Sequence, residues 1–297
     1  MEGWFCWGIS PDLSTLKING SNSYLHSMDK NRSKVSIVIP TYNRPDLLRR
    51  AVESSLNQTY SNIEVIVVDD HSDHDLNALI KEYPSVKFYQ NEDNKGGCYS
   101  RNRGISESTG EYINFLDDDD ELLPDKIGLQ VQKFRESLVD NIGFVTAHTE
   151  DNRSGEKVIK TNRVSGNMYR KLLTGYAISG IETMLIKKEC LLETGGFDDK
   201  LKSSQEYDLM IRLSEKYNVD FVDRVLSREY RSRDQISLNF EKKMAGARYL
   251  FQKHDLRYRE VGPFFWLKMR LKLRGLICRF YIGKWFGEKA YRFTIRN

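Results

Sequence analysis

The segment YINFLDDDD, residues 112–120, joins an apolar run to four consecutive aspartates. Residues 112–116 predict a buried strand, and the aspartates follow directly at its end. Carboxylates this close repel one another unless a cation lies among them. At the end of a buried strand we expect that cation to be a divalent metal held by hard oxygen ligands. The ordinary alternative for such a charge run is an acidic surface turn.

Two further strands favour the metal site over the surface turn. Apolar runs at residues 35–39 and 63–68 also read as buried strands, and each is followed by polar residues, Tyr42 after the first and Asp70 after the second. A helix is expected between them, with Asn43 as its cap and Pro45 in its first turn. The pattern continues with a strand at residues 86–89, a helix at 98–108 and a strand at 142–146.

This alternation of strands and helices predicts an α/β fold whose mostly parallel, Rossmann-like sheet is flanked by helices. Parallel strands place their carboxyl ends at one edge of the sheet, where ligands of such sheets bind. We therefore expect Tyr42, Asp70 and the four aspartates to converge in space, although they are far apart in the sequence.

Composition sets limits on the class of protein. The chain has 297 residues, of which 39% are hydrophobic, enough for a packed core. Its four cysteines are scattered and suit a reducing cytosol. No signal peptide is evident, and no apolar run reaches the roughly 20 residues of a spanning helix. We expect a poorly ordered extension at residues 1–33, a catalytic domain at 34–235 and a helical, basic region at 236–297.

The C-terminal region carries most of the positive charge. Residues 263–297 contain nine Lys or Arg and one acid, Glu288, a net of +8, so the remaining residues carry +4 − 8 = −4. A helical face made of Phe265, Met269, Leu273, Leu276 and Phe280 is flanked by basic residues, which is typical of a helix lying in an anionic membrane surface. The alternative is a helix packed on the catalytic domain with its basic side in water. Nucleic acid is disfavoured because no recognised motif accompanies the charge.

The first strand lacks both the Gly-x-Gly-x-x-Gly turn of dinucleotide-binding folds and a Gly-Lys-Ser/Thr phosphate loop. A nucleotide would therefore be held by acidic residues and a metal, with Tyr42 stacked on its base.

Six segments, in order, resemble the family 2 glycosyltransferases, which have the GT-A fold. They are VSIVIPTYNR (35–44), VVDDHS (67–72), NKGGCYSRNRG (94–104), LDDDD (116–120), GGFD (195–198) and QEYDL (205–209). Together they cover about residues 34–235.

The resemblance implies roles for individual residues. Pro40, Thr41, Tyr42 and Asp70 would frame the base of a nucleotide sugar, usually a uridine one, and Arg44 belongs to the same segment. Arg101 would lie near the base or diphosphate, and Asp118 would face the ribose. Asp119, with Asp117, would bind Mn²⁺ or Mg²⁺, which neutralises the leaving diphosphate. Asp120 is expected either behind these ligands or in solvent.

Inversion at the anomeric carbon needs a base for the acceptor hydroxyl. The family usually has Glu-Asp where this chain has Gln205-Glu206, so Glu206 keeps a carboxylate at the base position and Asp208 is its rival. For either residue, a carboxylate favoured by the helix dipole is the structural alternative. Arg231 and Arg233 would bind the diphosphate as a lid, and a solvated basic loop is the alternative.

The resemblance therefore implies an inverting, metal-dependent hexosyltransferase. We expect it to use a UDP-sugar and a polyprenyl-pyrophosphate-linked acceptor, as bacterial O-antigen and capsule enzymes do, at the cytoplasmic face of the cell membrane. The alternatives are transfer to a protein or small molecule, or a non-catalytic protein that binds nucleotide sugars.

Overall fold

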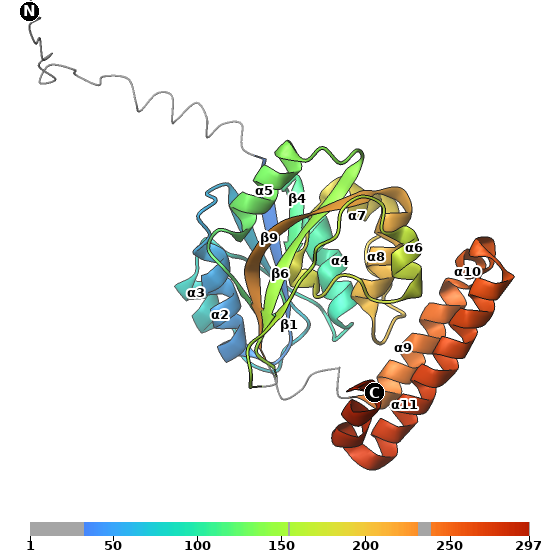
Figure 1. Ribbon diagram of the computed structural model, residues 1–297. Helices are drawn as coiled ribbons and strands as arrows, with labels where there is room; N and C mark the ends of the chain where they lie inside the picture. Colours follow the sequence, from blue (N-terminus) through green and yellow to red (C-terminus); the bar gives the residue numbers. More distant parts are fainter. Residues whose placement is uncertain (1–32, 154, 231–238, 297) are drawn as a thin grey trace, which may run out of the picture. The chain divides into compact units, whose positions relative to one another are not determined.

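The computed structural model describes residues 33–153, 155–230 and 239–296, and Ser33–Asn297 form one compact unit. Arg231 and Arg233 lie outside the described residues. A single sheet has the order β3-β2-β1-β4-β8-β6-β9-β5, with β7 added beside β6 (Figure 1). Its strands are β1 (Val35–Thr41), β2 (Ile63–Asp69), β3 (Lys87–Gln90), β4 (Tyr112–Phe115), β5 (Glu121–Leu122), β6 (Ile142–Asp151), β7 (Val158–Lys160), β8 (Leu185–Lys187) and β9 (Asn218–Glu229).

The pairing confirms the predicted mostly parallel sheet. Strands β3, β2, β1 and β4 are parallel neighbours, and β6 and β9 form a second parallel pair. Antiparallel β8 joins the two groups, while β5 and β7 pair antiparallel at β9 and β6. Strand β1 is thus central, with the carboxyl ends of β2 and β4 on either side of its own.

Helices cover both faces of this sheet (Figure 1). The alternating residues Val35, Ile37 and Ile39 of β1 pack with α2, α3 and α5, whereas Val38 packs with α4, α6, α7 and α8. The helices are α2 (Pro45–Leu56), α3 (Asn77–Glu82), α4 (Gly97–Glu107), α5 (Lys126–Glu136), α6 (Tyr169–Thr174), α7 (Lys188–Thr194) and α8 (Gln205–Lys216), with a 3₁₀ turn η1 (Ile181–Thr183).

Helix α2 begins at Pro45, one residue later than a cap at Asn43 would place its first residue. Pro45 is its first residue, as predicted, and Arg44 holds the capping position without a side-chain bond. Asn43 has a φ of 56° and exchanges two hydrogen bonds with Asp73, of 3.0 and 2.8 Å. The prediction that Asn43 caps α2 was wrong, because its amide closes the loop between two strand ends instead.

The C-terminal region is helical, as predicted: α9 (Phe240–Lys253), α10 (Asp255–Val261) and α11 (Pro263–Arg296), which is kinked at Gly287. The apolar face of α11 predicted for a membrane faces inward instead. Met269 is buried in the main core, and Phe280 is buried against α9 with Leu273 and Leu276. The alternative of a packed helix is correct for this face.

Candidate active site

The ends of the three parallel strands β1, β2 and β4 meet through direct hydrogen bonds. The amide of Asp70, after β2, donates to the carbonyl of Thr41 at the end of β1, at 2.9 Å. The Thr41 hydroxyl donates to Oδ2 of Asp118, after β4, at 2.8 Å. The convergence predicted from the sequence is therefore present, and Thr41 is the residue that links the other two strand ends.

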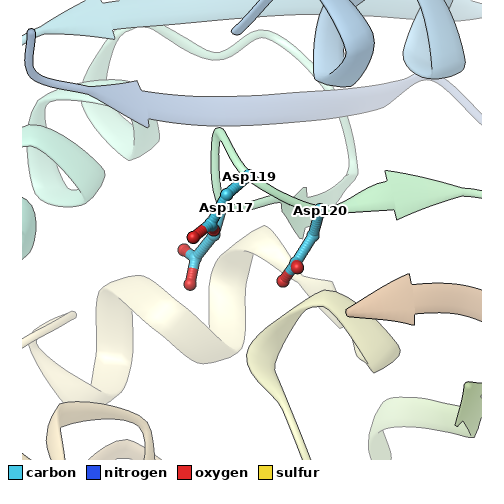
Figure 2. Close-up of side chains that lie close together, drawn as sticks. All are labelled: Asp117, Asp119 and Asp120. Atoms are coloured by element: carbon cyan, nitrogen blue, oxygen red, sulfur yellow. The ribbon is translucent and has the colours of Figure 1, made fainter. Parts of the chain in front are cut away.

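Three of the four aspartates turn their carboxylates toward one another (Figure 2). The amide of Asp120 donates to the carbonyl of Asp117 at 3.0 Å, a tight turn that brings residue 120 back beside residue 117. One carboxylate oxygen each from Asp117, Asp119 and Asp120 lies within 4.8 Å of the others. Asp120 was expected behind the ligands or in solvent, but it is buried and completes this cluster.

Asp118 points away from this group, toward β1 and α2. Burial raises the pKa of Asp118 to about 6, although Arg44 and the Thr41 hydroxyl favour its charged form. The Arg44 guanidinium lies 3.1 Å from Asp118 and 3.6 Å from Asp119. Arg44 is therefore a cation at the edge of the carboxylate cluster. The sequence segment in which it lies does not by itself predict this location.

The cluster suits a hard divalent cation. Burial raises the pKa of Asp120 well above its usual range, and the neighbouring carboxylates of Glu182, Asp119 and Asp117 add to this effect. Its Oδ1 accepts a 3.0 Å hydrogen bond from the amide of Tyr230. Three carboxylates this close repel one another when charged and would each be stabilised by a shared cation, so these residues fit Mn²⁺ or Mg²⁺.

Arg101 connects this cluster to the first turn of α8. It is buried on α4, and its guanidinium donates to Oδ1 of Asp117. Burial opposes its charge, but Asp117 and Glu206 outweigh this and raise the pKa of Arg101 further. Its guanidinium also lies 5.4 Å from the centre of the Phe197 ring. The Arg101 guanidinium thus contacts Asp117 and interacts electrostatically with Glu206.

Glu206 lies at the start of α8, as the sequence predicts. Burial raises the pKa of Glu206, Arg101 acts against this rise, and Asp117 adds to it. A carboxylate whose pKa is raised is a stronger base. The dipole of α8 acts in the opposite direction because it favours the charged form in the first turn.

Both carboxylate oxygens of Asp208, the rival base, contact other side chains of the protein. Its side chain has no exposed surface, and its Oδ2 lies 2.6 Å from Arg212 and 3.0 Å from Lys253. Its Oδ1 lies 2.9 Å from Nε2 of His254. Burial opposes its charge, but these three cationic or donor groups hold the pKa of Asp208 well below its usual range. This carboxylate fastens α8 to the end of α9.

Asp70 fixes the entry to α4. It is buried, and its carboxylate accepts hydrogen bonds from the Asn91 amide group at 2.8 Å and from the amides of Lys95 at 3.0 Å and Gly96 at 2.7 Å. Through this loop it sets the position at which α4 presents Arg101. The predicted hydrogen bond between Asp70 and the nucleotide base stays a prediction.

The residues expected around the base lie at the end of β1. Pro40 is buried in that strand, opposite Val68 of β2. Tyr42 follows the strand with 42% of its surface exposed, so its ring is accessible to a ligand.

The comparisons with known proteins agree with this fold. Residues 36–189 match the family model described as Glycosyl transferase family 2. A Campylobacter jejuni protein named GalNAc(5)-diNAcBac-PP-undecaprenol beta-1,3-glucosyltransferase is 31% identical over 177 residues, 58% of this chain and 57% of that protein. Escherichia coli WcaA, named for colanic acid biosynthesis, is 29% identical over 241 residues, 77% of this chain and 84% of that protein.

Other relatives are much longer. An uncharacterized glycosyltransferase of Rickettsia bellii is 32% identical over 203 residues, which are 66% of this chain but 28% of that protein. The chain spans about a third or less of the Rickettsia proteins that it matches. Among solved structures, Staphylococcus aureus TarS 1–349 in complex with UDP-GlcNAc shares the fold, with a TM-score of 0.59, 17% identity and coverage of 82% of this chain and 81% of that chain.

Proposed function

The chain belongs to glycosyl transferase family 2, and on that premise we propose that it transfers a hexose, glucose or galactose, from a UDP-sugar to a sugar hydroxyl. The acceptor is a saccharide linked to polyprenyl pyrophosphate, made during surface-polysaccharide synthesis. The names of the Campylobacter jejuni and Escherichia coli relatives support this class of acceptor. One observation carries the proposal: carboxylate oxygens of Asp117, Asp119 and Asp120 lie within 4.8 Å of one another after β4, and Arg101 pairs with Asp117.

The donor is held at the ends of β1 and β2. Tyr42 stacks on the uracil ring, with Pro40 and Thr41 beside it, and Asp70 accepts a hydrogen bond from the base. Arg44 and Arg101 flank the carboxylate cluster and so supply positive charge where the diphosphate binds. Asp118 faces the ribose. Arg231 and Arg233, outside the described residues, are proposed to bind the diphosphate as well.

Asp117, Asp119 and Asp120 would hold Mn²⁺ or Mg²⁺, since their oxygens lie close enough to share one ion. The ion would supply Lewis-acid stabilisation of the diphosphate leaving group. Arg44 forms ion pairs with Asp118 and Asp119 and so helps to position both carboxylates.

Transfer proceeds with inversion. The acceptor hydroxyl oxygen forms a bond to the anomeric carbon, the bond from that carbon to the UDP oxygen breaks, and UDP leaves with the electron pair. Glu206 takes the hydroxyl proton, because its carboxylate is less engaged by protein donors than that of Asp208. Asp208 has a positioning role: it orients the first turn of α8, on which Glu206 lies.

An acceptor of this kind is embedded in a lipid bilayer, so the enzyme works at a membrane surface, on the cytoplasmic face. The described residues contain no helix long and apolar enough to cross a membrane. Contact with the bilayer is therefore proposed to be peripheral and made through the C-terminal region.

A donor screen tests the proposal. The purified chain is incubated with UDP- and GDP-sugars and Mn²⁺ or Mg²⁺, and nucleoside diphosphate release and protection against thermal unfolding are measured. We expect one UDP-hexose to be hydrolysed slowly, at a rate that a lipid-linked or short saccharide acceptor raises. NMR of the product should show a β linkage from an α-linked donor. Retention of configuration would refute the single-base step, and undiminished activity in EDTA would refute the metal.

A further inference from the structure

Helix α11 has a second apolar face, opposite the one that packs on α9. Its members are Phe264, Leu267, Leu271, Cys278 and Trp285, and we call this set the α11 stripe. All five are exposed, Phe264 by 88% and Trp285 by 74%. Apolar side chains exposed in one row are unusual on a soluble protein and indicate a contact surface.

The spacing of these residues makes the row continuous. They follow one another at intervals of three, four, seven and seven residues, which places them along one side of a helix. The small Gly275 and the partly buried Ile282 fall in the same row. At 1.5 Å per residue the stripe is about 32 Å long, and it ends just before the kink at Gly287.

Basic residues line both sides of the stripe. By helical spacing Lys268 and Arg279 lie on one side, and Arg270 and Arg274 on the other, all exposed. Two other lysines of α11 are partly committed to the protein, since Lys272 donates to the carbonyl of Thr174 and Lys284 pairs with Glu241 at 2.7 Å. An apolar row between two basic rows, with a tryptophan at one end, matches the chemistry of an anionic lipid surface.

We propose that the α11 stripe lies in the headgroup region of an anionic bilayer, with Lys268, Arg270, Arg274 and Arg279 contacting lipid phosphates. The occupant is a lipid surface, because the charge of +8 on residues 263–297 is complementary to it. The biological reason for such contact rests on the lipid-linked acceptor of the proposed function, but the contact itself does not require transfer.

The packed face of α11 connects this surface to the site. Phe265 and Trp266 pack against the main core, which also holds Leu209 of α8. Helix α11 lies alongside α9 (Figure 1), and the end of α9 binds Asp208, one turn or less from Glu206. The helix proposed to contact the bilayer therefore packs against α9, whose end also positions α8 and Glu206.

A fluorescent label reports the contact directly. In the described residues Cys98 and Cys190 are buried and Cys278 is exposed in the stripe. In a Cys6→Ser background, an environment-sensitive dye on Cys278 should shift to the blue with phosphatidylglycerol vesicles at low salt. The shift should weaken at high salt, since the charges are screened, and be small with phosphatidylcholine vesicles. An unchanged emission with phosphatidylglycerol vesicles would overturn the proposal.

Paired variants separate the stripe from general hydrophobicity. Leu267→Gln/Leu271→Gln keeps good helix formers and should lower vesicle partitioning by at least about tenfold. The matched pair Leu138→Gln/Leu192→Gln removes two leucines that are also exposed, by 98% and 59%, on other elements and should leave partitioning unchanged. Arg274→Gln/Arg279→Gln should lower partitioning into phosphatidylglycerol vesicles by about fivefold per residue.

Three results would contradict the proposal. Equal partitioning of both leucine pairs would mean that the stripe does not touch lipid. A dimer that the stripe variant dissociates, without vesicle binding by either protein, would make the stripe a contact between two copies. Binding to duplex DNA in place of vesicles would assign the charge to nucleic acid. UDP-sugar hydrolysis measured on the same samples keeps the two proposals apart, since its loss bears on the proposed function alone.

Discussion

Nε2 of His254 lies 2.9 Å from Oδ1 of Asp208, and neither side chain has any exposed surface. Arg212 and Lys253 contact the other oxygen of the same carboxylate. Asp208 is thus the point at which α8, which carries Glu206, is fastened to the end of α9.

Replacing Asp208 by Asn should act on stability more than on chemistry. The change leaves the largely buried Arg212 and Lys253 without their anion, and losing one partner of a buried pair costs about 3–5 kcal/mol. Urea unfolding measures the loss, and turnover should be normalised to folded protein. Activity that vanishes while the fold is fully stable would restore Asp208 as a candidate base.

Glu206→Gln should give the opposite result. Turnover should fall by about 10² or more because the acceptor proton has no base. Donor affinity and the urea midpoint should change little, since Glu206 acts on the acceptor rather than on UDP. Initial rates at varied donor and acceptor concentrations measure this, and near-normal turnover would show that Glu206 is not the base.

The stability difference between the wild type and Asp208→Asn should depend on pH. The pKa of Asp208 is lowered in the folded state, so its carboxylate stabilises the fold above the unfolded-state pKa of about 3.9. That contribution is lost as pH falls through the lower folded-state pKa. Urea unfolding from pH 7 to 3 should show a constant difference above about pH 5 that narrows below about pH 4. A difference that widens on acidification would contradict this linkage.

Asp120→Asn should weaken Mn²⁺ binding by about 10- to 100-fold, the range seen when a residue supporting a metal site is changed. The side chain keeps its shape but loses the charge that it adds to the cluster. Metal titration of donor hydrolysis measures the effect. Asp140→Asn, an exposed residue before β6, is the matched control and should bind Mn²⁺ as the wild type does. If both variants bind Mn²⁺ equally well, Asp120 is not a ligand.

The stabilisation that Mn²⁺ gives should grow with pH. Asp118 has a pKa raised to about 6, and the pKa of Asp120 is also raised, so without metal the folded state takes up protons that the unfolded state does not. The metal-free protein therefore gains stability as pH falls from 7 toward 5, and protons compete with the ion. Thermal unfolding with and without Mn²⁺ should show a larger increment at pH 7.5 than at pH 5.5. Equal increments would mean that Asp120 does not bind the ion.

The strands, most helices and the meeting of the strand ends follow from local patterns in the sequence. The position of the Asp120 carboxylate in the cluster does not follow from such patterns, because it depends on a turn that brings residue 120 back beside residue 117. The amide of Asn43 was misassigned as a cap because Asp73, its partner, is distant in the sequence.

The exposed apolar face of α11 was also misassigned, for a different reason. The helix carries two apolar faces, one through Met269 and Phe280 and one through Leu267 and Leu271, and both have helical spacing. Periodicity identifies such faces but not which of them a neighbouring helix covers. Basic residues lie between the two faces and therefore flank both of them, so the charge pattern does not distinguish the faces.

The bond between Asp208 and the end of α9 also limits how this chain can be recombined with its relatives. The family match ends at residue 189, whereas Asp208, Lys253 and His254 all lie beyond it. A chimera joined between β9 and α9 would separate the Asp208 carboxylate from Lys253 and His254, which it contacts. A chimera joined before α7 would transfer Asp208 together with Arg212, Lys253 and His254. The smallest exchangeable unit is therefore larger than the segment that the family model matches.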